Sequence, residues 1–290
     1  MEVAITAVAL DCALGADGDA VAAILAGEVG VRPHPPLSWL PSDLAGLATP
    51  SHRPWLKRRK DAKLMTRAAR LGLSVCGRAV SGYTGSRRDL GLFIGVGREP
   101  PDDGEAEDSL AAAARDGLLD ETLLAGRGRD LYPPLLPLKT LPNMILAHAS
   151  INLGIQGDNG AWAGDEDAAL QALRAGYWAV IEGRCPAALV GGADSSVELG
   201  AARDRLRRGR TGPPGEGAAA FLLQPIAEAT APIALLSLTA PGSDVPDRRV
   251  QLGDCGAAEG ILALAIAVLS GQSAVIGPLS VRPAGGRSRD

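Results

Sequence analysis

The sequence has few aromatic residues, few histidines and no excess of positive charge. Aromatic side chains make up 3% of the 290 residues, three histidines occur, and the formal net charge is −4. Without a basic excess the chain has no global field that would attract nucleic acid, so nucleic-acid binding is not expected. The longest apolar run, ILALAIAVL after Gly260, is shorter than a membrane-spanning helix. It is interpreted as a buried helix, and no membrane association is expected.

Metal-binding, secretory and phosphate-binding signals are also missing. No CxxC motif and no His/Cys cluster with zinc spacing occurs, and the acids at 165–167 fail the calcium-loop pattern, so no metal is expected. Asp165 is predicted instead to cap a helix. The N-terminal MEVAITAVALDC lacks the basic region of a signal peptide, which predicts a cytoplasmic protein without disulfides. The G-x-G at Gly95–Gly97 lacks the third glycine of a dinucleotide loop, so no cofactor is expected.

Apolar strand-like segments alternate with helix-like segments along the chain, which implies an α/β protein with helices on both faces of a sheet. Strands are predicted at 2–10, 90–97, 187–190, 217–223 and 233–238. Helices are predicted at 19–26, 63–80, 109–119, 142–153, 165–183 and 257–269. Asp17 or Asp19 is the predicted cap of the first helix, the proline-rich segment 33–54 is predicted to be a long loop, and the tail from Pro283 is predicted to be disordered.

Several segments occur in a recognisable order. The chain opens with EVAITAVALDCALGADGDAVAAILAGEVGVRP, followed by LGLFIGVG, LPNMILAHASINLGIQGDN and AWAGDEDAALQALRAGYWAVIEGRCPAALVGGAD. GEGAAAFLL and GDCGAAEGILALAIAVLSG come after them. In this order and spacing the segments resemble the β-ketoacyl synthase branch of the thiolase superfamily. The resemblance covers most of residues 1–225 and only pieces beyond.

The resemblance implies a thiolase-like layered αβαβα fold with a complete N-terminal half and a reduced C-terminal half. The expected division is 1–230 for the complete half, with the nucleophile elbow at 157–167, then 231–283 for the reduced half and 284–290 for a flexible tail. Proteins of this fold pair elbow-adjacent strands across a two-fold axis. Ile151 to Gly160 and Ala161 to Ala163 are therefore expected at a dimer interface.

Residues that the family uses for catalysis are replaced at the aligned positions. Such synthases acylate a Cys within an A-C-A/S-G elbow and use two His residues. The elbow aligns with Ala161 to Gly164, which puts Trp162 at the nucleophile position, and an indole cannot be acylated. The second His aligns with Asp254, whose charge is wrong for stabilising an oxyanion, and the stretch between Ser237 and Gln251 contains no His. No catalytic residue is therefore expected.

The resemblance thus predicts a non-catalytic, chain-length-factor-like subunit. It would pair with an active β-ketoacyl-[acyl carrier protein] synthase in fatty-acid or polyketide-type biosynthesis, for example of polyenes. A heterodimer and a homodimer both stay open. One alternative is a repurposed thiolase-fold acyltransferase or hydrolase that uses Cys255 or Asp254, although Cys255 is also interpreted as a small buried hydrophobe. Another is a scaffold that binds the carrier protein.

A run of basic residues is the candidate surface for an acyl carrier protein, because in the family such residues meet the acidic helix of the carrier. Charges of this kind steer encounter more than they add affinity. An equally weighted interpretation is a solvated charged face. The candidate residues are Lys57, Arg58, Arg59, Lys60 and Arg67. Elsewhere, Ser195 and Ser196 are expected in a hydrogen-bonded turn, and His148 is expected to be a hydrogen-bonded core or interface residue.

Overall fold

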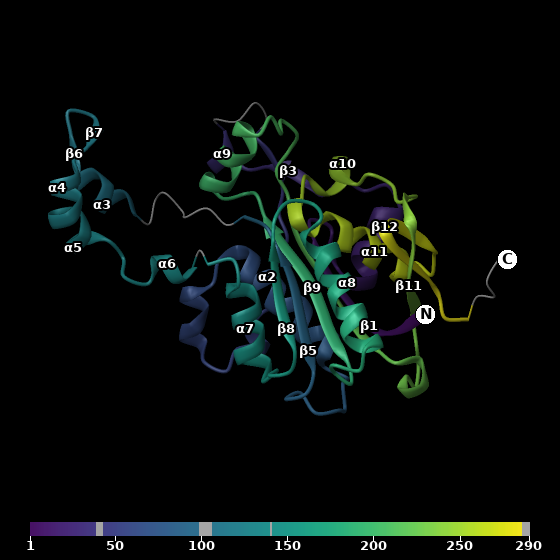
Figure 1. The fold of residues 1–290 in the computed structure, drawn as a ribbon. Helices are drawn as coiled ribbons and strands as arrows, with labels where there is room; N and C mark the ends of the chain where they lie inside the picture. Colours follow the sequence, from purple (N-terminus) through teal and green to yellow (C-terminus); the bar gives the residue numbers. More distant parts are fainter. Residues whose placement is uncertain (39–42, 99–105, 140, 286–290) are drawn as a thin grey trace.

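The computed structural model describes residues 1–38, 43–98, 106–139 and 141–285. One mixed sheet forms the centre of this part of the chain (Figure 1). Its strands are β1 (Glu2–Cys12), β2 (Gly15–Ala16), β5 (Gly91–Val96), β8 (Asn159–Ala163), β9 (Ala188–Ser195), β10 (Glu216–Gln224), β11 (Ala234–Ser243) and β12 (Ala274–Pro283). Their order across the sheet is β12-β11-β1-β10-β9-β5-β8, with β2 paired to β1.

The sheet combines a parallel and an antiparallel part. Strand β5 runs parallel to both β8 and β9, whereas β10 runs antiparallel to β9 and β1. Beyond β1, the antiparallel pair β11 and β12 extends the same sheet, so the C-terminal strands add to the first sheet. The predicted α/β class is confirmed.

Helices cover both faces of the sheet (Figure 1). Two of them, α2 (Arg67–Val80) and α7 (Met144–Leu153), lie on one face, and α1 (Asp17–Leu25), α8 (Ala168–Ile181) and α11 (Glu259–Leu269) lie on the other. Because side chains alternate along a strand, Phe93 packs on the α8 side and its neighbour Ile94 on the α2 side. The α8 helix passes so close to the sheet that a Cβ at Gly95 would collide with the backbone of Ala169.

Shorter elements connect these layers. They are β3 (Val31–Pro33), η1 (Pro35–Leu37), β4 (Leu44–Gly46), η2 (Arg53–Trp55), η3 (Arg59–Leu64), α9 (Leu199–Arg207), η6 (Ile226–Glu228), α10 (Arg249–Leu252) and η7 (Gly256–Ala258). A further group of short elements stands away from the sheet as an arm, at the left of Figure 1. The arm consists of α3 (Glu107–Ala112), β6 (Ala114–Arg115), β7 (Leu118–Leu119), α4 (Glu121–Leu123), η5 (Leu124–Gly128), α5 (Arg129–Leu131) and α6 (Leu136–Lys139).

Several predicted helix starts are wrong. The α1 helix follows Ala16, and neither Asp17 nor Asp19 caps it, because the Asp17 carboxylate instead accepts the N–H of Leu10 at 2.8 Å. The α2 helix begins four residues after Lys63, where the Thr66 hydroxyl caps it by accepting the N–H of Ala69. Residues 59–64, predicted in part as helix, form a 3-10 segment instead.

Other corrections concern the segments around glycine and proline. The predicted helix 109–119 stops at Ala112, and a two-residue turn at Asp116 and Gly117, both with positive φ, closes a small hairpin. The strand predicted at 187–190 continues to Ser195. The predicted loop 33–54 holds β4, η1 and η2, with 39–42 outside the described residues. The predicted disordered tail begins on β12, a strand that the sequence did not reveal, and 286–290 lie outside the described residues.

Candidate functional site

The turn from β8 into α8 is the place where the sequence predicts a nucleophile elbow. It is formed by residues 164–167, because β8 ends at Ala163 and α8 begins at Ala168. The predicted capping role of Asp165 is wrong, since no side chain caps α8, and the Asp165 carboxylate accepts from Arg208 at 2.5 Å instead. The residues of this turn, and not those of the strand before it, face the C-terminal segments.

Trp162 does not lie in this turn. It is a residue of β8, in register with Gly95 of β5, and its indole lies 6.2 Å from the ring of Phe93, measured between ring centroids. The indole therefore packs half-buried on the α8 face of the edge strand. Trp162 thus lies on the strand that leads into this turn, and its assignment to the nucleophile position stays a prediction.

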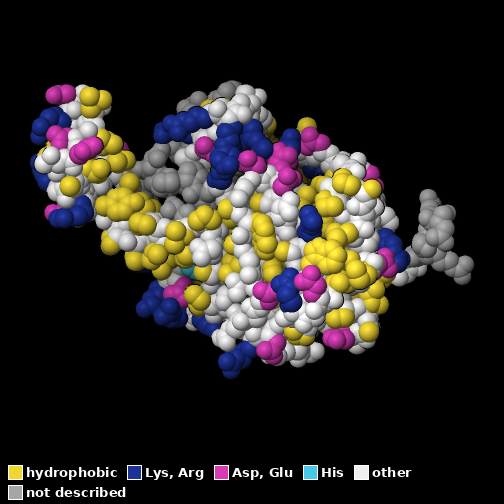
Figure 2. Space-filling view, in the orientation of Figure 1, with side chains coloured by type: hydrophobic (Ala, Val, Ile, Leu, Met, Phe, Trp, Pro, Cys, Tyr) yellow, Lys and Arg dark blue, Asp and Glu magenta, His cyan; other side chains and the backbone are white. Residues whose placement is uncertain are grey.

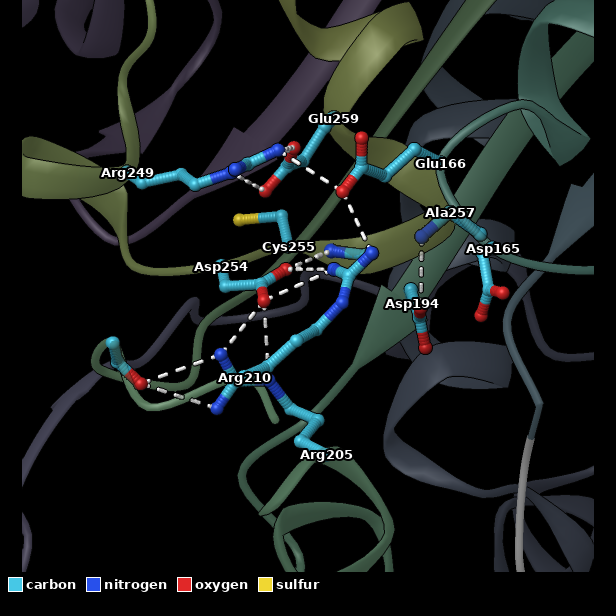
Figure 3. Close-up of polar contacts among 12 residues, drawn as sticks. Asp165, Glu166, Asp194, Arg205, Arg210, Arg249, Asp254, Cys255, Ala257 and Glu259 are labelled. Atoms are coloured by element: carbon cyan, nitrogen blue, oxygen red, sulfur yellow. Dashed lines mark hydrogen bonds and ion pairs between the residues drawn. The ribbon is translucent and has the colours of Figure 1, made fainter. Parts of the chain in front are cut away.

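Glu166 lies in the turn itself. Its Oε1 accepts from Arg210 at 2.6 Å and from Arg249 at 3.0 Å (Figure 3). Arg249 also donates from Nη2 to Glu259 at 2.7 Å. Oε1 of Glu166 therefore accepts from two guanidinium groups, and these charge-assisted hydrogen bonds tie the turn to Arg210 and to Arg249.

Asp254 lies next to this cluster and is also engaged. Its carboxylate accepts from Arg205 at 2.7 Å, from Arg210 at 3.0 Å and from the N–H of Gly256 at 3.0 Å. Burial raises the pKa of Asp254, but the Arg205 hydrogen bond and charge, with Gly256 and Arg210, outweigh burial and lower the pKa to about 2. Asp254 is therefore a fixed anion near neutral pH and is unsuited to transferring a proton there.

Cys255 is fully enclosed. Its side chain is 1% exposed, and burial, followed by the charges of Glu259 and other anions, raises the pKa of the thiol well above its usual range. Because the thiolate is the nucleophile, a buried cysteine with a raised pKa behaves as a small apolar residue. This geometry argues against an acyl transfer at Cys255.

We expect all four cysteines to resist alkylation in the folded protein. Each is buried, and burial raises the pKa of Cys12 to about 11 and that of Cys76 to about 12. At pH 8, iodoacetamide should label the native protein at least roughly a hundredfold more slowly than the urea-unfolded chain, since thiolate is scarce and sterically enclosed. Mass spectrometry of the intact protein measures this. Rapid single labelling at Cys255 would restore it as a candidate nucleophile.

Asp194 connects the end of β9 to η7. Its carboxylate accepts the N–H of Ser195 at 2.8 Å and that of Ala257 at 2.9 Å. Gly97 and Gly256 leave the space that this carboxylate fills, because a Cβ at either position would collide with it. Burial raises the pKa of Asp194 to about 6, and the N–H groups of Ala257 and Ser195 only partly oppose this.

The contribution of Asp194 to the free energy of unfolding should therefore fall as the pH rises from about 4 to about 6. A carboxyl whose folded pKa lies above its unfolded value binds its proton more tightly when folded, so ionisation above pH 6 opposes folding. Between pH 7 and pH 5 this group should add about 1 kcal/mol to the free energy of unfolding.

Urea titrations of the parent protein and of Asp194→Asn at pH 7 and at pH 5 measure this contribution of Asp194 to stability. The pKa values of His52 and His148 are lowered, first by burial, and these residues act in the opposite direction in both proteins. The difference between the two proteins therefore isolates Asp194. Equal pH dependence in both would contradict the assignment.

Three of the predicted carrier-binding residues are exposed and have no ion pair in the described part of the chain, namely Lys57, Arg59 and Lys60. Arg58 pairs with Asp61 at 3.2 Å. Arg67 differs from the prediction, because its guanidinium turns inward, where Nε donates to the fully buried Glu216 at 2.7 Å. Arg67 is therefore a structural partner of Glu216 with a partly exposed side chain, and its contact with a carrier protein stays a prediction.

The remaining polar candidates have structural roles. The Ser195 hydroxyl donates to Glu216 at 2.9 Å, although Ser195 ends a strand and does not lie in the predicted turn. His148 is buried, with Nε2 3.3 Å from the carbonyl oxygen of Leu64, which confirms a hydrogen-bonded core histidine. Among the described residues no His/Cys/Asp/Glu group could hold a metal ion, and no helix there is long and apolar enough to cross a bilayer.

One edge of the sheet and the arm together expose an apolar surface. Within the described chain β8 pairs with β5 alone, so its outer backbone edge is open. Hydrophobic side chains gather along the arm and toward α7 (Figure 2). The exposed members are Leu110, Leu118, Leu119, Leu124, Leu131, Tyr132, Leu135, Leu138, Leu141 and, on α7, Ile151. These exposed side chains make the region a candidate interaction surface. In this region the sequence analysis predicted only a helix at 109–119 and did not reveal the exposed apolar side chains.

Comparison with known proteins gives a family and a fold. The family model described as Beta-ketoacyl synthase, N-terminal domain, matches residues 1–229. No curated protein matches the chain. Among solved structures, the ishigamide ketosynthase/chain length factor is 18% identical with a TM-score of 0.66, and the alignment covers 97% of this chain and 98% of that one.

Two further structures are similar. The complex AntDE:AntF, a type II PKS acyl-carrier protein with its ketosynthase bound to the hexaketide, gives a TM-score of 0.71 at 13% identity, covering 97% of this chain and 99% of that one. A β-ketoacyl synthase from Burkholderia phymatum STM815 gives 0.60 at 20% identity, covering 85% of this chain and 65% of that one. At these identities the likeness establishes the fold.

Proposed function

The chain belongs to the β-ketoacyl synthase family, and from this premise we propose that it is a non-catalytic ketosynthase-like subunit that pairs with an active β-ketoacyl-[acyl carrier protein] synthase. In this proposal residues 1–230 supply the complete half of the fold and residues 231–283 a reduced half. The pathway would be of the polyketide or fatty-acid type, for example polyene formation. The structural neighbours supply the context, since they include a ketosynthase/chain length factor and a ketosynthase with its acyl-carrier protein.

The observation that supports this proposal most is the ion-pair cluster at the elbow. A covalent acyl intermediate needs an available nucleophile beside a base that can take its proton. At the turn stands Glu166, paired with Arg210 and Arg249, and beside it stands Asp254, paired with Arg205 and Arg210. Every one of these groups is engaged in an ion pair, so the cluster can stabilise the fold but offers no free group for acyl transfer.

The apolar edge formed by β8, α7 and the arm supports a partner subunit. An open strand edge can pair with a strand of another chain, and exposed leucines beside it would be covered in the same contact. Ala161 and Ala163 on β8 and Ile151 on α7 are exposed at this edge. These residues lie within the segments that the sequence predicts at a dimer interface.

A carrier protein would dock on the basic run Lys57–Lys60. Lys57, Arg59 and Lys60 present exposed positive charge, and a carrier protein offers an acidic helix to it. Binding of this kind is salt-dependent, because exposed charges are screened over about 8 Å at physiological ionic strength. A carrier-binding scaffold that forms homodimers is the second candidate, since the same two surfaces would serve it.

Co-expression with an intact ketosynthase encoded beside this chain tests the proposal. Size-exclusion chromatography with mass determination should give a stable one-to-one complex. A homodimer that ignores the ketosynthase but retains the carrier protein would favour the scaffold. Acyl transfer or ester hydrolysis by the isolated chain, lost in Cys255→Ser or Asp254→Asn, would favour the repurposed enzyme and refute the proposal.

A further inference from the structure

A cavity of about 350 Å³ opens beside the elbow cluster, between α8, α10, α11 and β12. Its walls are apolar and are formed by Leu170, Leu252, Leu262, Ile266 and Ile276. Pockets that bind small molecules are concave and mostly apolar, with volumes from roughly 300 Å³ upward. The cavity has the volume and wall chemistry of a site for a small apolar molecule.

The rim of the cavity carries more negative than positive charge. Glu166, Asp167, Asp247 and Glu259 line it, against the two cations Arg248 and Arg249. An anionic ligand would therefore meet repulsion at the rim unless one of the two arginines were available to it.

Both arginines already donate hydrogen bonds at the cavity. Arg249 donates from Nε to Glu259 at 2.9 Å and from Nη2 to Glu166 at 3.0 Å, and dashed lines join it to both carboxylates in Figure 3. The Nη1 of Arg248 donates to the Gln251 side chain at 2.9 Å. A carboxylate or phosphate here would compete with Glu166 and Glu259 for Arg249, and near Arg248 it would meet the negative charges of Asp167 and Asp247, which also line the cavity.

From the apolar walls and the excess of acidic over basic residues in the lining, we propose that this cavity binds an uncharged apolar chain and rejects the same chain when it ends in an anion. The binding does not depend on the partner subunit, because no residue of β8, α7 or the arm lines the cavity. If the chain fails to bind ketosynthase, the proposal for the cavity is unaffected. If the cavity binds no ligand, the proposed partner surface is unaffected.

The matched pair decan-1-ol and decanoate tests the site, since the two share one chain and differ in end charge at pH 7.5. Isothermal titration calorimetry on the full chain should show saturable binding of decan-1-ol in the micromolar range. Decanoate should bind at least about tenfold more weakly, equivalent to about 1.4 kcal/mol. Equal affinity for the two ligands, or binding of neither, would overturn the proposal.

Two variants locate the site. Ala263→Phe adds a ring to the cavity wall and should weaken decan-1-ol binding at least about tenfold, whereas Ala175→Phe, half-buried on α8 and away from the lining, should not. Glu259→Gln releases Arg249 from one carboxylate and should bring decanoate to within about threefold of decan-1-ol. Melting temperatures of all variants confirm that they fold. Unchanged binding in Ala263→Phe, or an unchanged preference in Glu259→Gln, would refute this assignment.

Discussion

Replacing Arg205 by alanine is expected to lower the free energy of unfolding by about 3 kcal/mol. The side chains of Arg205 and Asp254 are 10% and 8% exposed, and the two groups lie 2.7 Å apart. Removing the arginine leaves a buried anion whose burial is no longer compensated, and such uncompensated charges cost far more than the pair itself contributes. Arg210 still contacts Asp254 at 3.0 Å, which keeps the expected loss at the lower end of the range for buried pairs.

Urea denaturation at pH 7 measures this loss, with Arg207→Ala as the matched control. Arg207 lies on the same helix, is exposed, and has no ion pair in the described part of the chain. Its replacement should change stability by less than about 0.5 kcal/mol. The double variant Arg205→Ala/Asp254→Asn should recover part of the loss, because it removes the stranded charge. Equal stability of the two single arginine variants would show that the cluster does not hold these segments together.

The second large effect is expected on partner binding. The double variant Ile151→Asp/Ala161→Asp places two carboxylates on the exposed apolar edge, where Ile151 is 57% exposed. If this edge is the partner surface, burying both charges should weaken the complex with ketosynthase at least about a hundredfold, corresponding to about 2.7 kcal/mol. Surface plasmon resonance on the purified pair measures the change in Kd.

Leu25→Asp serves as the control for this experiment. Leu25 ends α1, is 53% exposed, and belongs to a helix that packs near β1, several strands away from β8. Its replacement should leave the Kd within about twofold. A complex that tolerates the double variant would move the partner surface elsewhere. If the chain forms a homodimer, the same double variant should make it monomeric, which distinguishes the two assemblies.

The sequence predicted strands best where burial on both faces leaves a continuous apolar run. The strand expected at 90–97 is observed as β5, and that expected at 217–223 as β10, each within two residues. Helix boundaries were less accurate, because caps and close contacts decide them. The α8 helix begins where its small residues Ala168 and Ala169 meet Gly95 and Gly192, which is a tertiary contact that local pattern does not contain.

The candidate site was only partly predictable for a similar reason. Asp254 was found from its place in a motif, but its partners Arg205 and Arg210 come from a segment more than forty residues earlier. Glu166 was taken for a helix-terminal acid, because charge near a helix start is common and its pairing with Arg249 joins residues 83 positions apart. The place of Trp162 on β8, with its indole against Phe93, likewise depends on strand pairing with β5, which local sequence does not show.

The two edges of the sheet differ, and this has a consequence for the cell. On one side β12 and β11 extend the sheet past β1, whereas on the other side β8 pairs with β5 alone within the described chain, so its outer backbone edge is open. Copies of this chain made in excess of their partner would expose a strand edge that templates aggregation. Synthesis in step with the partner, or rapid removal of surplus copies by proteases, would therefore be part of how such a subunit is maintained.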